Sequence, residues 1–402
     1  MVCGEDELFG PGQGTRPAHV PEKPRRIEPI EIRDYQQDAL DGIATEMEKG
    51  ARRILLVLLT GLGKTVVAAK VVQAMIRGGL RVVFLAHRRE LVNQCAAKLE
   101  RFGVPHGVVM AGVDPNHEHL VQVASIQTLW VRGVKRSAME LPAADVLIID
   151  EAHRSRGATY EALLKHYDKA VVLGLTATPC RADGKGLGNV YQAMVQGPTL
   201  DLATKHGHLV PVRYFGAAAE PDLSKVKTVA GDYHEGQLAE AMDKPKLVGD
   251  IVQHWGRLAS SRQTVVFATS VQHSINLTLE FQKAGVKAEH LDGNTPIDER
   301  TAILRRLENG ETQVVCNCEV LIEGWDCPPV GCVVLGRPTK SVARFIQMCG
   351  RTLRPYPGKT DCIVLDHAGS VMTHGRLDEF VSWSLAPDTT IQQRQKAAKK
   401  KT

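Results

Sequence analysis

Short apolar runs alternate with amphipathic stretches along most of the chain, and this alternation predicts strands followed by helices. In the first half, the predicted buried strands lie within residues 54–57, 80–86, 121–129, 146–149 and 171–175. The second half repeats the rhythm, with predicted strands within residues 263–270, 288–293, 313–318 and 358–367. Strands that alternate with helices build parallel sheets covered by helices. The pattern therefore predicts an α/β protein with two such units in tandem.

Composition and periodicity divide the chain into four parts. Residues 1–29 are rich in glycine, proline and charge, and we expect a mobile arm. Residues 30–210 and 211–383 are the two predicted domains, because the pattern loosens after about residue 200 and residues 209–215 could begin a new sheet. Residues 384–402 are predicted to be a basic disordered tail, either simply solvated or weakly attracted to a nucleic-acid backbone.

A glycine-containing turn between a predicted strand and a predicted helix is the first chemical signal. Residues 58–65 read Leu-Leu-Thr-Gly-Leu-Gly-Lys-Thr, which matches the phosphate-binding pattern G-x-x-x-x-G-K-[ST] except for a leucine at the first glycine position. A backbone with Gly61 and Gly63 can curl so that its amides face phosphates at a helix N-terminus. Lys64 would reach the β and γ phosphates, and the Thr65 hydroxyl would hold Mg²⁺. The alternative is a glycine turn beside a surface lysine. The loop residues predicted to bind ATP are Thr60, Gly61, Leu62, Gly63, Lys64 and Thr65.

Two adjacent carboxylates follow the apolar run 146–149. Parallel α/β sheets bind their ligands at the carboxyl ends of their strands. Asp150 can hold Mg²⁺, and Glu151 can polarise the water that attacks the γ phosphate. Chance acidic residues at a strand end are the alternative, but two ionised carboxylates would repel one another without a cation.

Other predicted strands end in groups that suit a sugar-phosphate backbone. His87 and Arg88 follow the strand 80–86, and Ser125 to Thr128 lie at the end of another. The hydroxyls of Thr176 and Thr178, at the end of the strand 171–175, could link the ATP site to a bound strand. A basic loop in water and a proline-terminated turn are the plain alternatives.

A predicted helix near the end of the second half carries two arginines three residues apart. Arg351 and Arg354 would lie on one helical face and could offer two guanidinium groups to the γ phosphate held by the first half. Such an arginine finger can contribute about 10³ to 10⁵ in rate. An ordinary basic helix is the alternative.

Together these motifs resemble those of superfamily 2 helicases of the DEAD/DEAH type. The glycine loop, the sequence Asp-Glu-Ala-His at 150–153 and Thr-Ala-Thr at 176–178 resemble motifs I, II and III, and Gln347-x-x-Gly-Arg351-x-x-Arg354 matches motif VI. Within the superfamily, the chain looks most like bacterial and phage helicases related to the helicase subunit of type III restriction enzymes. The family commonly has threonine where this chain has Ile322.

The resemblance implies two RecA-like domains with an ATP and Mg²⁺ cleft between them, and it adds residue roles. Arg33 and Gln36 resemble the adenine-reading motif, and Gly324 and Asp326 of motif V are expected to contribute to ATP binding. Gln347 joins Lys64, Glu151, Arg351 and Arg354 as an expected catalytic residue, and His153, Thr176 and Thr178 would couple the sites. Expected nucleic-acid contacts are His87, Arg88, Gln94, Ser125, Gln127, Thr128, Ser270, Asp292 and Gly293. The implied activity is an ATP-dependent DNA helicase. A duplex translocase and an ATP-gated clamp that holds a strand are the alternatives.

Overall composition changes this picture little. Lysine plus arginine exceed aspartate plus glutamate by 50 to 45, which is compatible with a polyanionic partner. Apolar runs fall short of the ~20 residues of a membrane span, and no signal peptide is apparent, so we expect a cytoplasmic protein of a bacterium or its phage. The nine cysteines contain no C-x-x-C pair, and reduced buried thiols are favoured over a zinc site. We expect DNA, single-stranded or forked, rather than RNA, and a separate protein would supply any nuclease or targeting function.

Overall fold

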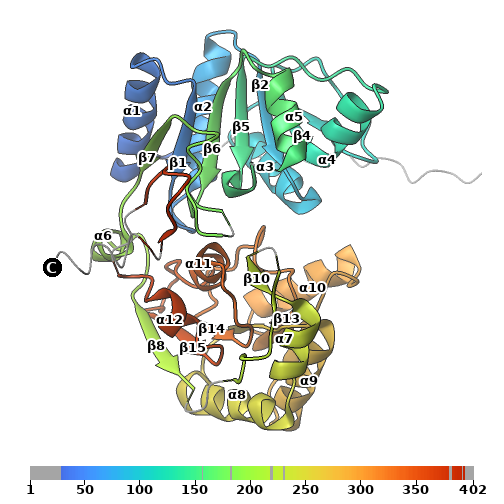
Figure 1. The fold of residues 1–402 in the computed structure, drawn as a ribbon, viewed down its shortest axis with the longest axis vertical. Helices are drawn as coiled ribbons and strands as arrows, with labels where there is room; N and C mark the ends of the chain where they lie inside the picture. Colours follow the sequence, from blue (N-terminus) through green and yellow to red (C-terminus); the bar gives the residue numbers. More distant parts are fainter. Residues whose placement is uncertain are drawn as a thin grey trace, which may run out of the picture.

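The computed structural model describes residues 29–155, 157–181, 183–217, 221–229, 231–379, 383–391 and 393. Almost all of the predicted N-terminal arm and most of the predicted tail lie outside these residues. Figure 1 shows two α/β units, one above the other, with helix α11 (Val342–Gly350) between them.

The first unit is built on a seven-stranded sheet with the order β3-β4-β2-β5-β6-β1-β7, in which every pair is parallel. Its strands are β1 (Arg53–Val57), β2 (Val82–Ala86), β3 (Gly107–Val109), β4 (Val121–Ser125), β5 (Val146–Asp150), β6 (Val171–Thr176) and β7 (Ala193–Gln196). The helices are α1 (Asp34–Glu48), α2 (Lys64–Arg77), α3 (Arg89–Arg101), α4 (Ile126–Thr128) and α5 (Ala158–His166), with a π-helical turn at Leu129–Lys135 and a 3₁₀ turn at Ala152–Arg154.

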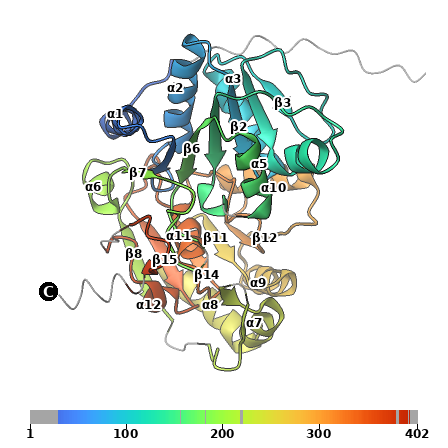
Figure 2. The same cartoon turned by 45° about the horizontal axis from the view of Figure 1, so that its top comes forward.

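The second unit is built on a six-stranded parallel sheet with the order β12-β13-β11-β14-β15-β8. Its strands are β8 (Val212–Gly216), β11 (Thr264–Phe267), β12 (Ala288–Leu291), β13 (Val314–Asn317), β14 (Cys332–Leu335) and β15 (Cys362–Asp366), and β9 (Thr228–Val229) pairs with β10 (Asp232–Tyr233) apart from it. The helices of the second unit besides α11 are α7 (Glu235–Met242), α8 (Pro245–Leu258), α9 (Val271–Lys283), α10 (Ile297–Glu308) and α12 (Ser370–His374) (Figure 2). Helix α6 (Leu200–Lys205) packs Leu200 and Ala203 into the core of the first unit. The prediction of parallel sheets covered by helices is confirmed.

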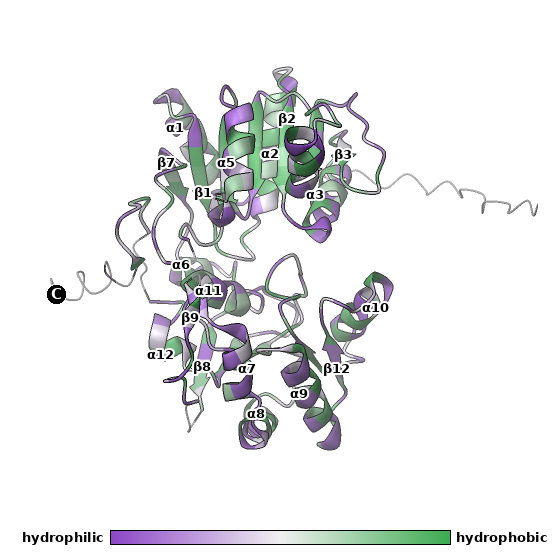
Figure 3. Ribbon diagram, turned by 45° about the vertical axis from the view of Figure 1, so that its right-hand side comes forward, coloured by the Kyte–Doolittle hydropathy of each residue, from purple (hydrophilic) through white to green (hydrophobic). Residues whose placement is uncertain are grey.

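Successive residues of a strand point to opposite faces of its sheet and pack into separate hydrophobic cores. In β1, Ile54 and Leu56 pack with α1, α2 and α3, whereas Leu55 and Val57 pack with α5 on the other face. Figure 3 shows the strands of the first sheet and α2 as mostly hydrophobic. Burial on both faces explains why these strands read as continuous apolar runs in the sequence.

The segment after residue 383 differs from its prediction. Residues 384–391 were expected to be disordered, yet the Gly186 and Gly188 amides donate to the Ala386 and Leu385 carbonyls at 3.0 and 2.7 Å. Ile391 is 1% exposed within a hydrophobic cluster. The prediction of a disordered tail is therefore wrong for residues 384–391, because apolar contacts with both units hold this segment in place.

Candidate nucleotide and nucleic-acid site

The phosphate loop connects β1 to α2, as the glycine pattern predicts. Gly61 and Gly63 have φ angles of 94° and 79°, in the left-handed region that favours glycine. A Cβ on Gly63 would lie 2.5 Å from Gln36 Nε2, so a side chain has no room there. Lys64 begins α2, and its Nζ donates to the Leu58 carbonyl at 3.1 Å. Burial lowers the pKa of Lys64, and the charges of the two carboxylates after β5 oppose this shift.

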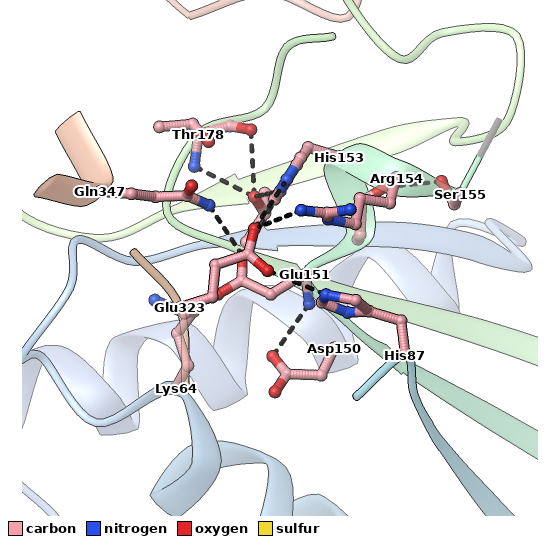
Figure 4. A network of polar contacts seen from close by, with 12 residues as sticks. Lys64, His87, Asp150, Glu151, His153, Arg154, Ser155, Thr178, Glu323 and Gln347 are labelled. Atoms are coloured by element: carbon pink, nitrogen blue, oxygen red, sulfur yellow. Dashed lines mark hydrogen bonds and ion pairs between the residues drawn. The ribbon is translucent and has the colours of Figure 1, made fainter. Parts of the chain in front are cut away.

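Those carboxylates lie at the end of β5, facing Lys64 (Figure 4). Burial, followed by the charge of Glu151, raises the pKa of Asp150 to about 6. Burial also opposes ionisation of Glu151, but the hydrogen bond and charge of His153 outweigh it and lower the pKa of Glu151. A cation near Asp150 would favour its charged form. The described residues contain no group of three or more histidine, cysteine or acidic side chains that could hold a metal. Asp150 and Thr65 remain the predicted Mg²⁺ ligands, and a Mg²⁺ held by few protein groups keeps phosphate and water oxygens as its other ligands.

Glu151 is contacted from both halves of the molecule. Its Oε2 lies 3.4 Å from His153 Nδ1 and accepts a hydrogen bond at 3.5 Å from Nε2 of Gln347 on α11. His153 Nδ1 lies 3.5 Å from Thr176 Oγ1, which in turn accepts from the Thr178 amide at 3.1 Å. The three predicted coupling residues thus form one connected group beside the predicted water-polarising carboxylate (Figure 4).

The two arginines of motif VI are held differently from one another. Arg351 donates to the Ile322 and Trp325 carbonyls, at 2.6 to 3.0 Å, so its donors are engaged within the second unit. Arg354 pairs with Asp326, and a Cβ on Gly61 would lie 3.1 Å from its Cγ. Burial lowers the pKa of Arg354 to about 10, which leaves it charged at neutral pH. Arg354 is therefore a cation of the second unit that lies beside the phosphate loop.

The two residues of the predicted adenine motif lie at the start of α1, and Gln36 binds the phosphate loop. Gln36 is 4% exposed, its Nε2 donates to the Leu62 carbonyl at 3.0 Å and its Oε1 accepts from the Arg33 amide at 3.1 Å. Tyr35, which the sequence did not single out, also donates to the Leu62 carbonyl at 3.2 Å, and its ring lies 4.7 Å from that of His208. The start of α1 thus sets the position of the loop backbone.

In the first unit, the predicted strand-contact residues gather at the edge that faces the second unit. His87 Nε2 lies 2.8 Å from Glu323, and Gln127 donates to the His87 carbonyl at 2.6 Å. Gln94 donates to the Gly324 carbonyl, and Ser125 donates to Gln127 at 3.1 Å. Arg88 lies nearby and Thr128 is buried. The structure therefore brings His87, Arg88 and Gln94, which resemble motif Ia of the superfamily, against motif V.

In the second unit, the residues predicted to contact nucleic acid form hydrogen bonds with their own neighbours in the chain. Ser270 caps α9 by accepting from the His273 amide at 3.0 Å. Asp292 accepts from the Asn294 and Thr295 amides at 2.9 Å, and these bonds lower its pKa although burial opposes the shift. Gly293 follows it in the same turn after β12. The side chains of Ser270 and Asp292 therefore shape the turns that follow their strands.

One carboxylate of this region, Glu323, was not identified from the sequence. Glu323 has a side chain that is 2% exposed and lies among His87, Arg88, His153 and Arg154. Burial opposes its ionisation, but the His87 hydrogen bond and the Arg154 charge outweigh burial and lower the pKa of Glu323. The sequence signal that could have identified Glu323 is its position next to Gly324 in motif V. Its basic partners all come from the first unit, which the sequence does not show.

Comparisons with known proteins agree with this geometry. Residues 29–181 match the model of the type III restriction enzyme Res subunit, and residues 243–356 match the helicase conserved C-terminal domain. A 51.5 kDa protein of a Lactococcus phage is 32% identical over 323 residues, which cover 80% of this chain and 67% of that protein. The putative ATP-dependent helicase IRC3 of Saccharomyces cerevisiae is 32% identical over 358 residues, with coverage of 84% and 52%. The chain thus spans about half to two thirds of these relatives.

Solved structures share the fold. A fragment of a putative HsdR subunit of a type I restriction enzyme from Vibrio vulnificus has a TM-score of 0.69 at 21% identity, covering 89% of this chain and 68% of that one. The DNA-bound Type ISP restriction-modification enzyme LlaBIII has a TM-score of 0.64 at 19% identity, covering 85% and 28%. Both sheets are RecA-like, and within the described part of the chain no helix has the length and apolar character to cross a membrane. The chain belongs to the superfamily 2 helicases related to the helicase subunit of type III restriction enzymes.

Proposed function

We propose that this helicase-family ATPase is an ATP-dependent DNA helicase, which couples hydrolysis to translocation along a strand and to unwinding. The observation that carries the proposal is the meeting of two halves at one site. Glu151 of the first half contacts Gln347 of the second, and Arg354 lies over the phosphate loop. A site shared in this way makes hydrolysis depend on the relative position of the two halves.

In this proposal residues 30–210 and 211–383 act as the two moving domains. Lys64 and the loop amides bind the phosphates of ATP, while Glu151, oriented by His153, polarises the attacking water. Asp150 and Thr65 would hold Mg²⁺, which neutralises phosphate charge when it is bound. Arg354 adds positive charge from the second domain.

We place the nucleic acid along the edge formed by motif Ia and the strand ends of the second domain, held mainly through phosphates. DNA is favoured because the related restriction enzyme LlaBIII is described as bound to DNA, and another relative is named a DNA 3'-5' translocase. We also propose that it works in the cytoplasm of a bacterium or of a phage-infected cell, with a separate protein supplying any nuclease or targeting function.

A duplex translocase that does not separate strands is the second candidate. The translocase relative, from Sulfurisphaera tokodaii, is 24% identical over 372 residues and this chain covers 79% of it. Restriction subunits of Escherichia coli are also among the relatives. The motifs on which the first proposal depends are compatible with both activities.

The test measures ATPase activity with single-stranded DNA, duplex DNA, forked DNA and RNA, together with strand displacement on tailed and blunt duplexes. We expect DNA to stimulate hydrolysis, and Lys64→Ala and Glu151→Gln to abolish it. Strand displacement on a tailed duplex supports the helicase, whereas stimulation by duplex DNA without displacement supports the translocase. ATP-dependent binding with hydrolysis too slow for repeated steps would leave only a clamp. Equal rates with and without every nucleic acid would refute the proposal.

A further inference from the structure

One carboxylate of the second half lies among four basic side chains of the first. Glu323 Oε2 lies 2.8 Å from His87 Nε2 and 3.8 Å from Arg88 Nε. Its Oε1 lies 2.9 Å from Arg154 Nη2 and 3.8 Å from His153 Nε2. Figure 4 shows Glu323 reaching into this group from the opposite side of the site.

The basic side chains differ from the carboxylate in their access to solvent. The Glu323 side chain is 2% exposed, whereas the side chains of Arg88 and Arg154 are 34% and 43% exposed. A solvent anion can therefore approach the two arginines without first entering the interface. A backbone phosphate is such an anion, and its charge-assisted bonds to arginine are strong.

The same cluster reaches the hydrolytic site through a single side chain. His153 lies 3.8 Å from Glu323 and 3.4 Å from Glu151, so the two carboxylates face one imidazole from opposite sides. A contact path therefore runs from His87 and Arg88 through Glu323 and His153 to Glu151. One end of this path lies on the predicted nucleic-acid edge, and the other end is the predicted water-polarising group.

We propose that Glu323 is a positioning residue that makes ATP hydrolysis depend on nucleic acid. This inference rests on the proposed function. In the free protein the carboxylate takes the place of a phosphate beside His87 and Arg88, and it shares the His153 imidazole with Glu151. A nucleic-acid phosphate that binds Arg88 weakens the interaction of Glu323 with these basic side chains. His153 then interacts with Glu151 alone.

A purely structural role makes a different prediction. If Glu323 only neutralises buried basic groups, its loss destabilises the protein and lowers activity, but nucleic acid still accelerates whatever activity remains by the wild-type factor. If Glu323 restrains the free state, removing its charge raises the rate without nucleic acid and lowers the stimulation factor. The stimulation factor therefore separates the two roles, because loss of folded protein cancels in this ratio.

The experiment compares the wild-type chain with Glu323→Gln, which keeps the size and removes the charge. ATPase rates are measured with and without a single-stranded DNA oligonucleotide, and DNA affinity is measured without nucleotide. We expect the stimulation factor to fall about fivefold or more, the lower end of usual coupling between sites. We also expect a higher basal rate and tighter DNA binding, because the competing carboxylate is gone. Glu323→Asp, which keeps the charge, should recover part of the stimulation.

A matched control removes another carboxylate from the interface. Glu90 pairs with Arg300 across the two halves at 2.9 Å, and its side chain is 44% exposed. Glu90→Gln loses an ion pair between the halves without touching the Glu323 cluster, and it should keep the wild-type stimulation factor. An equal fall in both variants would overturn the proposal, because general loosening of the interface would then explain it.

Each remaining outcome also decides the question. An unchanged stimulation factor in Glu323→Gln, at any absolute rate, contradicts the inference. If that variant is inactive, DNA affinity decides: tighter binding supports competition by the carboxylate, and unchanged or weaker binding contradicts it. A wild-type chain that no nucleic acid stimulates refutes the proposed function itself, whereas stimulation shared equally by the wild type and the variant refutes only the role of Glu323.

Discussion

Gly350 is the last residue of α11, and it lies against Thr60 of the phosphate loop. A Cβ at this position would lie 2.9 Å from Thr60 Cβ and 3.1 Å from Thr60 Oγ1. Contacts this short force one neighbour to move, and Thr60 is itself buried. The missing side chain therefore lets the second half approach the loop that is predicted to bind ATP.

We expect Gly350→Ala to impair ATP turnover without weakening α11. Alanine stabilises a helix by about 1 kcal/mol relative to glycine, so α11 itself should not be weakened. Overpacking costs about 1–3 kcal/mol, and here it destabilises the contact between the two halves. A cost of about 1.4 kcal/mol corresponds to a tenfold lower kcat/KM for ATP. Steady-state ATPase assays measure this loss. Gly249→Ala in α8 is the control, because a Cβ there meets no atom within 4 Å. Equal kinetics in the two variants would mean that the contact does not limit turnover.

Single residues with a strong local pattern could be placed from the sequence, and residues defined by distant partners could not. Lys64 follows from its glycine turn, and Asp150 and Glu151 follow from the apolar strand before them. Glu323 could not be identified in this way, because its partners lie more than 150 positions away. Nor could the sequence show that the donors of Arg351 bind the carbonyls of motif V. Periodicity describes which face of an element is buried, but not what lies opposite.

The same distinction holds for whole elements. Most of the apolar strands were predicted, because their burial follows from their own residues. The short strands β3 and β7, at the two edges of the first sheet, and β14, inside the second sheet, were not predicted. The C-terminal segment 384–391 was expected to be disordered, yet it packs on both halves together with the preceding Trp383. Trp383 borders hydrophobic clusters of both, and Leu385 borders one in the first. Tertiary contacts, and not local propensity, order these pieces.

The docked segment gives a test at this scale. Ile391 is 1% exposed, and its amide donates to the Gly184 carbonyl at 3.1 Å. Truncating a buried isoleucine to alanine costs about 2–5 kcal/mol, and here the cost falls on docking of the segment. We therefore expect Ile391→Ala to speed chymotrypsin cleavage after Trp383 or Leu385 by about tenfold or more. Met372→Ala, at a side chain that is 82% exposed, is the control. Similar cleavage of both variants would show that Ile391 does not anchor the segment.

At the scale of the whole molecule, the carboxyl ends of both sheets point into one interface. Contacts at separate places cross it, among them Gln347 to Glu151, Arg300 to Glu90, and Gln94 to the Gly324 carbonyl. The parts predicted to bind ATP and nucleic acid therefore already touch in the protein alone. Ligands would act by strengthening or replacing these contacts, which is how binding shifts a population between closed and open arrangements.

The last prediction concerns the arginine that would complete the ATP site from the second half. Arg354 is still charged despite burial, touches the phosphate loop and pairs with Asp326, which is half exposed. An arginine finger contributes about 10³ to 10⁵ in rate, so we expect Arg354→Ala to bind ATP nearly normally and to turn it over at least about 10³-fold more slowly. Fluorescent nucleotide binding and single-turnover hydrolysis measure the two steps separately. Arg376→Ala, at an exposed side chain paired with Asp378, should change neither. Undiminished turnover in Arg354→Ala would mean that this arginine adds nothing to catalysis, and that the ATP site is not shared between the halves through Arg354.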